Sequence, residues 1–128
     1  MKIPSFNILK IFIRYGADVI TCSRNLETLS KKIIELKKLS TYEGQVIKGL
    51  ECDISDPEKT EEFFSTSINV MNGLDVLVNN AGIYGPIGAS EEIDIELWKE
   101  SIDINLNGPF HLCKLAIKYF KIKKDYYA

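Results

Sequence analysis

The feature that most constrains this chain is a nearly continuous apolar run, Leu74 to Val78, which follows Gly73. Such a run is typical of a strand covered on both faces, as in a parallel sheet with helices above and below it. Two more strands are predicted upstream, over Ala17 to Cys22 and Gln45 to Cys52, and each is followed by a stretch of helical periodicity. This alternation predicts βαβ units and an α/β fold.

The predicted helices have recognisable start and stop signals. An opening helix over Ile8 to Tyr15 is expected to end at Gly16, since helices commonly end at a glycine. Asn25 is a predicted N-cap for the second helix, and Asp56-Pro57 gives the third a capping carboxylate and a proline at its first position. Asp94 caps a long last helix, in which apolar residues keep helical spacing almost to the end. These signals predict a helix between each pair of consecutive strands.

Composition narrows the classes of partner. The 128 residues include 16 basic and 18 acidic side chains, and this balance disfavours a nucleic-acid binder or a protein held on an anionic membrane. Cys22, Cys52 and Cys113 form no CxxC pair, which argues against a disulfide framework and a zinc site. No apolar run reaches the length that a bilayer requires. We therefore expect a reducing, cytoplasmic setting, with no metal and no membrane partner.

Four short motifs follow the predicted strands or lie in the long helix. The carboxyl edge of an open α/β sheet is where such folds bind ligands. In chain order the motifs are Cys22-Ser23-Arg24-Asn25, Cys52-Asp53-Ile54, Asn79-Asn80-Ala81-Gly82 and Asn105-Leu106-Asn107-Gly108. This series resembles the short-chain dehydrogenase/reductase family, over about residues 16–120. The asparagine pair directly after an apolar strand is its most specific part.

The resemblance implies a partial Rossmann-like fold, a doubly wound parallel sheet in three αβα layers, with residues 1–128 as one NAD(P)-binding domain. It also implies an oxidoreductase that exchanges hydride between NAD(H) or NADP(H) and a small-molecule alcohol or carbonyl. The segment Ile83 to Gly88 is expected to border the substrate pocket. The substrate itself is left open.

Two parts of the family pattern are missing. Met1 to Asn7 stands where the first strand and its glycine-rich turn belong, and it contains no glycine. The C-terminal strands are also absent, with the catalytic serine and the Tyr-x-x-x-Lys segment. Tyr119 and Lys123 have that spacing, but they continue the long helix and are not expected to be the catalytic pair. We therefore expect a fragment that is inactive as this chain alone.

The resemblance assigns the adenosine half of the cofactor to two motifs. Asp53 matches the aspartate that accepts a hydrogen bond from the adenine amino group, with Ile54 against the ring. The alternative is that Asp53 only caps a turn. Asn80 matches the asparagine beside the adenosine ribose, while Ala81 and Gly82 let the backbone approach the nucleotide closely.

The residues after the predicted strand Ala17 to Cys22, which corresponds to the second strand of the family, bear on the choice of cofactor. A NAD-preferring Rossmann site usually has an acid here, which binds both ribose hydroxyls, whereas this chain has Ser23 and Arg24. An arginine at this place can pair with a 2′-phosphate, and Ser23 could add a hydrogen bond. We therefore expect NADP(H) in preference to NAD(H). The alternative is that Arg24 is simply a solvated surface residue.

Pro109 interrupts the long helix. It has no N–H, so in a continuous α-helix the carbonyl of Asn105, four residues earlier, loses its partner. The resemblance identifies Asn105 with the family's catalytic asparagine, whose main-chain carbonyl holds a water in a proton relay that reaches the catalytic lysine. The alternative is a helix kinked for packing alone.

The last expectations concern partners and stability. The long helix, residues 94–122, corresponds to one that the family commonly uses in oligomer interfaces, so a homo-oligomer or a non-catalytic interaction module is the alternative function.

Without the first strand, the strands near Ala17 and Gln45 should not pair with the one near Val76. Unless a partner or the segment Ile8 to Ile13 fills that gap, we expect an unstable chain.

Overall fold

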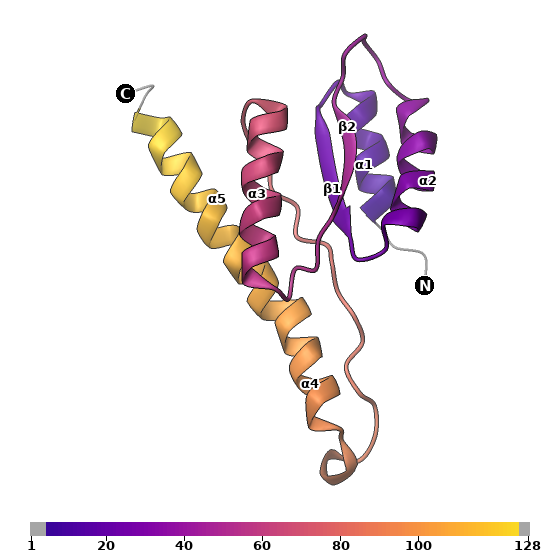
Figure 1. Ribbon diagram of the computed structural model, residues 1–128, viewed down its shortest axis with the longest axis vertical. Coiled ribbons are helices and arrows are strands. Elements are labelled where there is room, and N and C mark those ends of the chain that lie inside the picture. The colour runs from indigo at the N-terminus through magenta and orange to yellow at the C-terminus, as the bar shows by residue number, and fades with distance from the viewer. Residues whose placement is uncertain (1–4, 126–128) are drawn as a thin grey trace. The chain divides into compact units, whose positions relative to one another are not determined.

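The computed structural model describes residues 5–125, which form an α/β protein with a parallel sheet (Figure 1). The described residues form two compact units. The first contains the chain up to Asp53 and Ser65–Gly73, and the second contains Ile54–Phe64 and the chain from Leu74 onward. The helices and strands are α1 (Ser5–Arg14), β1 (Val19–Ser23), α2 (Leu26–Lys37), β2 (Ile47–Glu51), α3 (Pro57–Met71), α4 (Ile95–Ile102) and α5 (Gly108–Asp125).

The first unit is built on the pairing of β1 with β2. The two strands are parallel, in register from Val19 opposite Ile47 to Ser23 opposite Glu51. Helices α1 and α2 pack with this sheet, and the buried side chains between them are Ile13, Val19, Leu29, Ile33, Leu36 and Ile47. This is the βαβ arrangement that the alternation of patterns predicts, and the α/β class is confirmed.

The predicted helix boundaries are confirmed where local chemistry determines them. Asn25, Asp56 and Asp94 each accept a backbone N–H hydrogen bond through a side-chain oxygen, at 2.9, 3.0 and 2.8 Å respectively. Such bonds satisfy amides that have no partner inside the helix. Gly16, with φ at +84°, follows α1 in the left-handed conformation that glycine adopts without strain.

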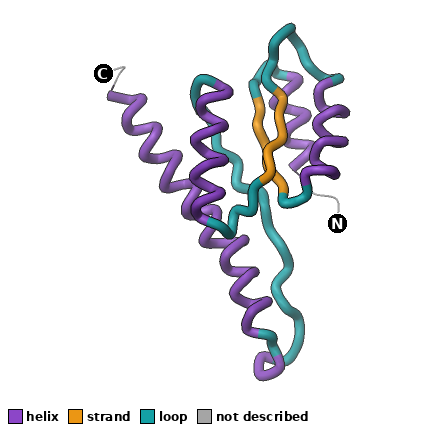
Figure 2. The backbone as a smooth tube through the Cα atoms, in the orientation of Figure 1, coloured by secondary structure: helices purple, strands orange, loops and turns teal. Residues whose placement is uncertain are grey.

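The predicted strand over Leu74 to Val78 is wrong. Among residues 5–125 the sheet contains only β1 and β2, and Figure 2 shows the stretch after α3 as loop. Val76 and Val78 are 55% and 47% exposed. A strand needs a neighbour for its backbone groups, and the segment Ile8 to Ile13, which could have supplied one, lies in α1.

The long helix of the second unit is divided into three parts. Helix α4 leads into a π-helical turn, Asp103–Asn107, and α5 begins at Gly108. The Gly108 N–H donates to the Asp103 carbonyl, five residues earlier, so the turn is one residue wider than an α-helical one. The predicted interruption at Pro109 is therefore present, as a wide turn.

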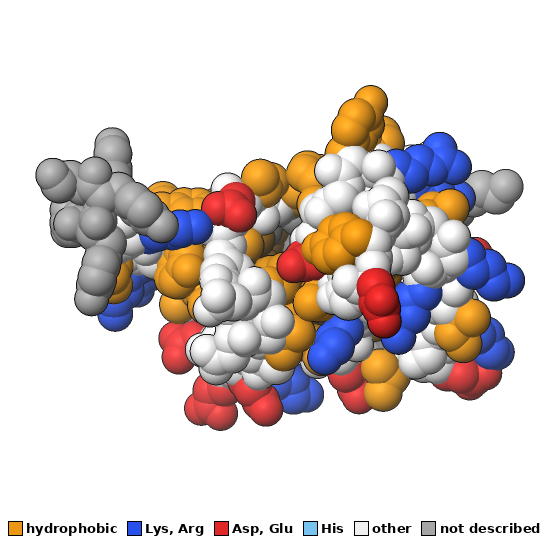
Figure 3. Space-filling view, turned by 90° about the horizontal axis from the view of Figure 1, so that it is seen from above, with side chains coloured by type: hydrophobic (Ala, Val, Ile, Leu, Met, Phe, Trp, Pro, Cys, Tyr) orange, Lys and Arg blue, Asp and Glu red, His pale blue; other side chains and the backbone are white. Residues whose placement is uncertain are grey.

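The apolar residues at helical spacing do not form the buried face of this helix. Leu106, Phe110 and Ile117 are 60%, 69% and 54% exposed. The buried positions are instead Ser101, Ile104, Gly108, Leu112 and Ala116. Figure 3 shows charged side chains of both signs among exposed apolar ones on the face of the protein that it presents. Of the helices between residues 5 and 125, none has the length and hydrophobicity to cross a membrane.

Candidate functional site

The carboxyl edge of the sheet brings two predicted site motifs together in the first unit. Ser23 ends β1 opposite Glu51, and its carbonyl accepts a hydrogen bond from the Cys52 N–H at 3.2 Å. Asp53, half-buried, follows directly. Ser23 Oγ accepts a hydrogen bond from the Asn25 N–H at 3.1 Å, so this hydroxyl also shapes the turn into α2. The exposed Arg24 lies within that turn.

Two cysteines lie at the same edge. Cys52 is buried, and its thiol is hydrogen-bonded to that of Cys22. This bond, together with burial, raises the pKa of Cys22 well above the ordinary value for a thiol. The Cys22 thiol therefore stays protonated at neutral pH and lacks the charge of a nucleophilic thiolate.

In the second unit, the motif after the apolar run forms a loop beside the long helix. Asn79 Nδ2 donates to Cys113 Sγ at 3.2 Å, which ties the start of the loop to α5. Asn80 is half-buried, whereas Ala81 and Gly82 are exposed. A Cβ added to Gly82 would lie 3.2 Å from Asn105 Oδ1, so the loop backbone runs close to that side chain. The structure thus brings Gly82 and Asn105 together.

Asn105 binds the next loop residue at two points. Its Oδ1 accepts a hydrogen bond from the Ile83 N–H at 2.9 Å, and its Nδ2 donates to the Ile83 carbonyl at 2.8 Å. The carboxamide therefore pairs with the loop as a neighbouring strand would. The side chain is thus occupied by the loop, and the role that the sequence predicts belongs to the main-chain carbonyl of Asn105.

The same loop also runs close to Ser101, which the sequence does not reveal. Ser101, one helical turn before Asn105, is buried, and its Oγ donates to the Trp98 carbonyl at 2.7 Å. A Cβ on Gly85 would come within 3.2 Å of that Oγ. The glycine in the loop is the sequence signal for this close approach, but it does not say which residue is approached.

Ile54 is placed differently from what an adenine contact requires. It is only 9% exposed, and its Cδ1 would lie 3.2 Å from a Cβ on Gly108. The side chain thus packs on the start of α5 and leaves little surface for an aromatic ring. An adenine role for Ile54 remains a prediction.

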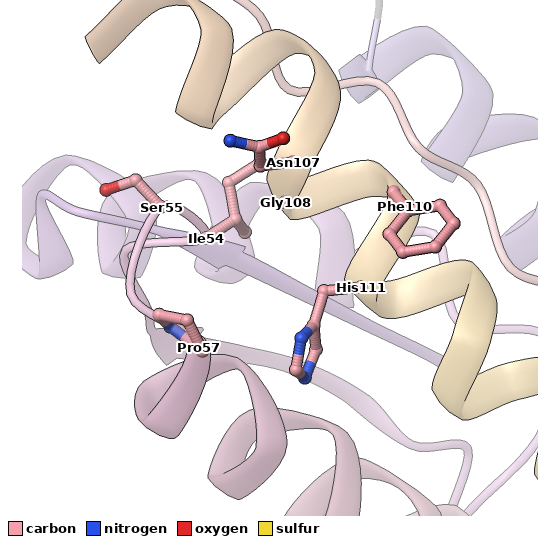
Figure 4. Close-up of a pocket in the computed structure, with 7 residues that line it drawn as sticks. All are labelled: Ile54, Ser55, Pro57, Asn107, Gly108, Phe110 and His111. Atoms are coloured by element: carbon pink, nitrogen blue, oxygen red, sulfur yellow. The ribbon is translucent and has the colours of Figure 1, made fainter. Parts of the chain in front are cut away.

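A half-open pocket of about 240 Å³ lies beside Ile54 in the second unit. It is lined by Ile54, Ser55, Pro57, Asn107, Gly108, Phe110 and His111 (Figure 4). The imidazole of His111 points toward the α3 side of this pocket, and its Nε2 lies 3.4 Å from Glu61 Oε1. Within the described residues there is no group of three or more His, Cys, Asp or Glu side chains that could hold a metal ion.

Comparison with known proteins agrees with the resemblance found in the sequence. The sequence profile of the short chain dehydrogenase family matches residues 6–126. A short chain dehydrogenase/reductase of Macrophomina phaseolina is 36% identical over 107 residues, which cover 84% of this chain and 59% of that protein.

Solved structures give the same result. An actinorhodin polyketide ketoreductase crystallised with NADPH matches with a TM-score of 0.82 and 29% identity, covering 94% of this chain and 44% of that one. An alcohol dehydrogenase from Thermococcus sibiricus, solved with 5-hydroxy-NADP, matches with a TM-score of 0.78 and 28% identity, covering 93% and 48%. The chain thus spans about half the length of these proteins. It belongs to the short-chain dehydrogenase/reductase family of NAD(P)-dependent oxidoreductases.

Proposed function

We propose that this chain holds the adenosine half of NADP(H) and supplies the catalytic asparagine of an oxidoreductase that interconverts an alcohol and a carbonyl. The observation that carries the proposal is the two-point pairing of Asn105 with Ile83. It fixes Asn105 beside the loop that begins with Asn80, and Pro109 has no N–H to donate to the Asn105 carbonyl, as the fourth residue onward does in a regular α-helix. That carbonyl can then accept a hydrogen bond from a water in a proton relay.

Each unit contains residues that fit one part of a dinucleotide. Asp53 would accept a hydrogen bond from the adenine amino group, and Asn80 would lie beside the ribose. Ala81 and Gly82 are exposed, so their backbone is accessible to the nucleotide. The bound cofactor would supply the hydride, and the protein would supply its binding and orientation.

We propose NADP(H) as the preferred cofactor. Arg24 is exposed at the end of β1, where its guanidinium could pair with a 2′-phosphate. Ser23 would add a hydrogen bond from its hydroxyl. The two related structures described above hold NADPH and 5-hydroxy-NADP, which supports this choice.

We propose further that residues 1–128 do not turn over substrate by themselves. Met1 to Asn7 contains no glycine to approach a pyrophosphate, and a Tyr-x-x-x-Lys segment on a further strand is lacking. The one pair with that spacing is Tyr119 and Lys123, and Lys123 Nζ lies 3.0 Å from Asp75 Oδ1. This pairing supports a surface role for the lysine. NADPH oxidation by the purified chain with a panel of carbonyl compounds would contradict this part of the proposal.

Fluorescence titration with NADPH and with NADH tests the cofactor assignment. Arg24→Ala should weaken NADPH binding by about tenfold, the scale of one lost charge-assisted hydrogen bond, and leave NADH binding unchanged. Arg14→Ala, which removes an exposed arginine in α1, is the matched control and should change neither. If the chain binds neither nucleotide, the proposed cofactor role of these residues is wrong.

A homo-oligomer formed through the long helix is the second candidate function. Leu106, Phe110 and Ile117 form an exposed apolar stripe on it. Before this stripe the helix has three acidic residues, Glu96, Glu100 and Asp103, and one lysine, Lys99, whereas Lys114, Lys118 and Lys121 lie along the stripe. Two antiparallel copies would place opposite charges together. Light scattering after size exclusion tests this. Phe110→Glu should give monomers, and a monomer at every concentration of the unaltered chain would exclude the oligomer.

A further inference from the structure

The start of α5 lies unusually close to the backbone of Ile54. A Cβ added to Gly108 would stand 2.5 Å from the Ile54 carbonyl oxygen and 3.2 Å from its carbonyl carbon. A real Cβ does not come within 3.0 Å of another heavy atom, so only glycine permits this contact. Gly108 is itself buried.

The same glycine closes the π turn. Its N–H donates to the Asp103 carbonyl, and the turn is held further by Asn107 Nδ2, which donates to Asp103 Oδ1 at 2.7 Å. The position of Gly108 on Ile54 therefore determines where the turn lies.

Asn105 stands inside this turn, and its pairing with Ile83 depends on where the turn lies. Its two hydrogen bonds, of 2.9 and 2.8 Å, are made by one short side chain to the main chain of one loop residue. Hydrogen bonds weaken steeply as distance and angle depart from these values. A small displacement of the turn would therefore disturb both bonds at once.

We propose that Gly108 is a positioning residue for Asn105: by seating the π turn directly on the Ile54 backbone, it places the carboxamide of Asn105 opposite Ile83. This deepens the proposed function and rests on it for the catalytic role of Asn105. The contact between Gly108 and the Ile54 backbone does not depend on whether Asn105 is catalytic.

The expected displacement follows from the distances. With alanine at position 108, the turn or the Ile54 peptide must retreat by at least about 0.5 Å to bring the Cβ contact to 3.0 Å. Ile54 is buried, and its carbonyl also accepts a hydrogen bond from Thr60 Oγ1 at 3.4 Å. The π turn, in which Asn105 is exposed, has more freedom than the buried Ile54 peptide, so we expect the turn to move.

Amide hydrogen exchange followed by NMR tests this on the whole chain, without cofactor or substrate. In Gly108→Ala, the Ile83 amide should exchange faster by about tenfold relative to other amides of the second unit, the scale of one lost hydrogen bond. The Ile33 amide in α2 should not change. Because nothing is bound or turned over, the result is independent of the nucleotide titration that tests the proposed function.

Ala116→Gly is the control for general weakening of the helix. Ala116 is buried in α5, two turns after Gly108, and its replacement loosens the helix without touching Ile54. If both variants accelerate Ile83 equally relative to the rest of the unit, Gly108 is merely structural and the proposal is overturned. It is also overturned if Ile83 is unchanged in Gly108→Ala, since the Ile54 peptide has then moved instead.

A second measurement uses the unaltered protein and decides the question if Gly108→Ala does not fold. The Ile83 and Gly108 amides should exchange through one opening, with the same dependence on low urea concentration. Different dependences would show that the two contacts open separately, which also overturns the proposal.

Discussion

The hydroxyl of Tyr42 donates to Asp18 Oδ1 at 2.7 Å, and the same oxygen accepts a hydrogen bond from the Val46 N–H at 2.8 Å. One carboxylate thus joins the start of β1 to the residue that precedes β2. It holds together the ends at which the two parallel strands begin pairing.

This contact predicts an alkaline titration step. The hydrogen bond to Asp18 raises the pKa of Tyr42 above the ordinary value of 10.0. A group whose pKa is raised on folding stabilises the fold fully below its unfolded pKa, and that contribution is lost as pH rises through the folded value. Phenolate absorbance should therefore show one tyrosine that ionises late, above pH 10. The late step should vanish in Tyr42→Phe and persist in Tyr15→Phe, where an exposed tyrosine is removed instead.

Gly49 in β2 should not tolerate a side chain. An added Cβ would stand 2.7 Å from Leu29 Cγ and 2.9 Å from Ile33 Cγ1, both in the core of the first unit. We expect Gly49→Ala to lower the free energy of unfolding by about 1–3 kcal/mol, as overpacking does. Urea melts followed by circular dichroism measure this. Lys48→Ala, at the exposed neighbouring position, should change stability by less than about 0.5 kcal/mol. Equal effects would contradict the packing argument.

The three cysteines should react with a thiol reagent in a fixed order. Cys113 is exposed, whereas Cys52 is buried and the raised pKa of Cys22 keeps its thiol protonated. Under native conditions we expect one fast thiol and two slow ones, by absorbance of the released chromophore. Cys113→Ser should remove the fast phase only. A fast phase that survives this substitution would mean that the thiol pair at the sheet edge is open to solvent.

The ion pair between Lys123 and Asp75 should matter little. Lys123 Nζ lies 3.0 Å from Asp75 Oδ1, and the Asp75 side chain is 89% exposed. Exposed pairs contribute about 0–1 kcal/mol, because solvent screens the charges. Lys123→Ala should therefore lower the free energy of unfolding, measured by urea melts, by no more than about 1 kcal/mol and leave NADPH binding unchanged. A loss of NADPH binding would restore this lysine as a candidate for the site.

The sequence predicts best those features that depend on neighbouring residues. The caps at Asn25, Asp56 and Asp94 are local hydrogen bonds, and the structure forms all three. The apolar run from Leu74 to Val78 fails as a strand because its pairing depends on a partner strand elsewhere, which no local pattern reveals. For the candidate site, the motif order indicates the family correctly. The pairing of Asn105 with Ile83 joins residues 22 apart and needed the coordinates.

The long helix shows a second limit. Regular spacing of large apolar residues selects Leu106, Phe110 and Ile117, yet these are exposed, and the buried line consists of Gly108, Leu112 and Ala116. Spacing identifies which residues share a face, but it does not say which face meets the rest of the unit. The glycine on the buried line, Gly108, follows from the closeness of Ile54, a contact between distant parts of the chain.

The π turn acts as a phase shift along the long helix. Because it contains one residue more than an α-helical turn, α5 is rotated by about 100° from where an unbroken helix would place it. Deleting a single residue within Asp103–Asn107 would restore regular winding and leave Gly108, Leu112 and Ala116 facing the interior, because the missing residue and the lost wide turn offset each other. The wide turn thus absorbs one residue between α4 and α5 without changing which residues of α5 face the interior.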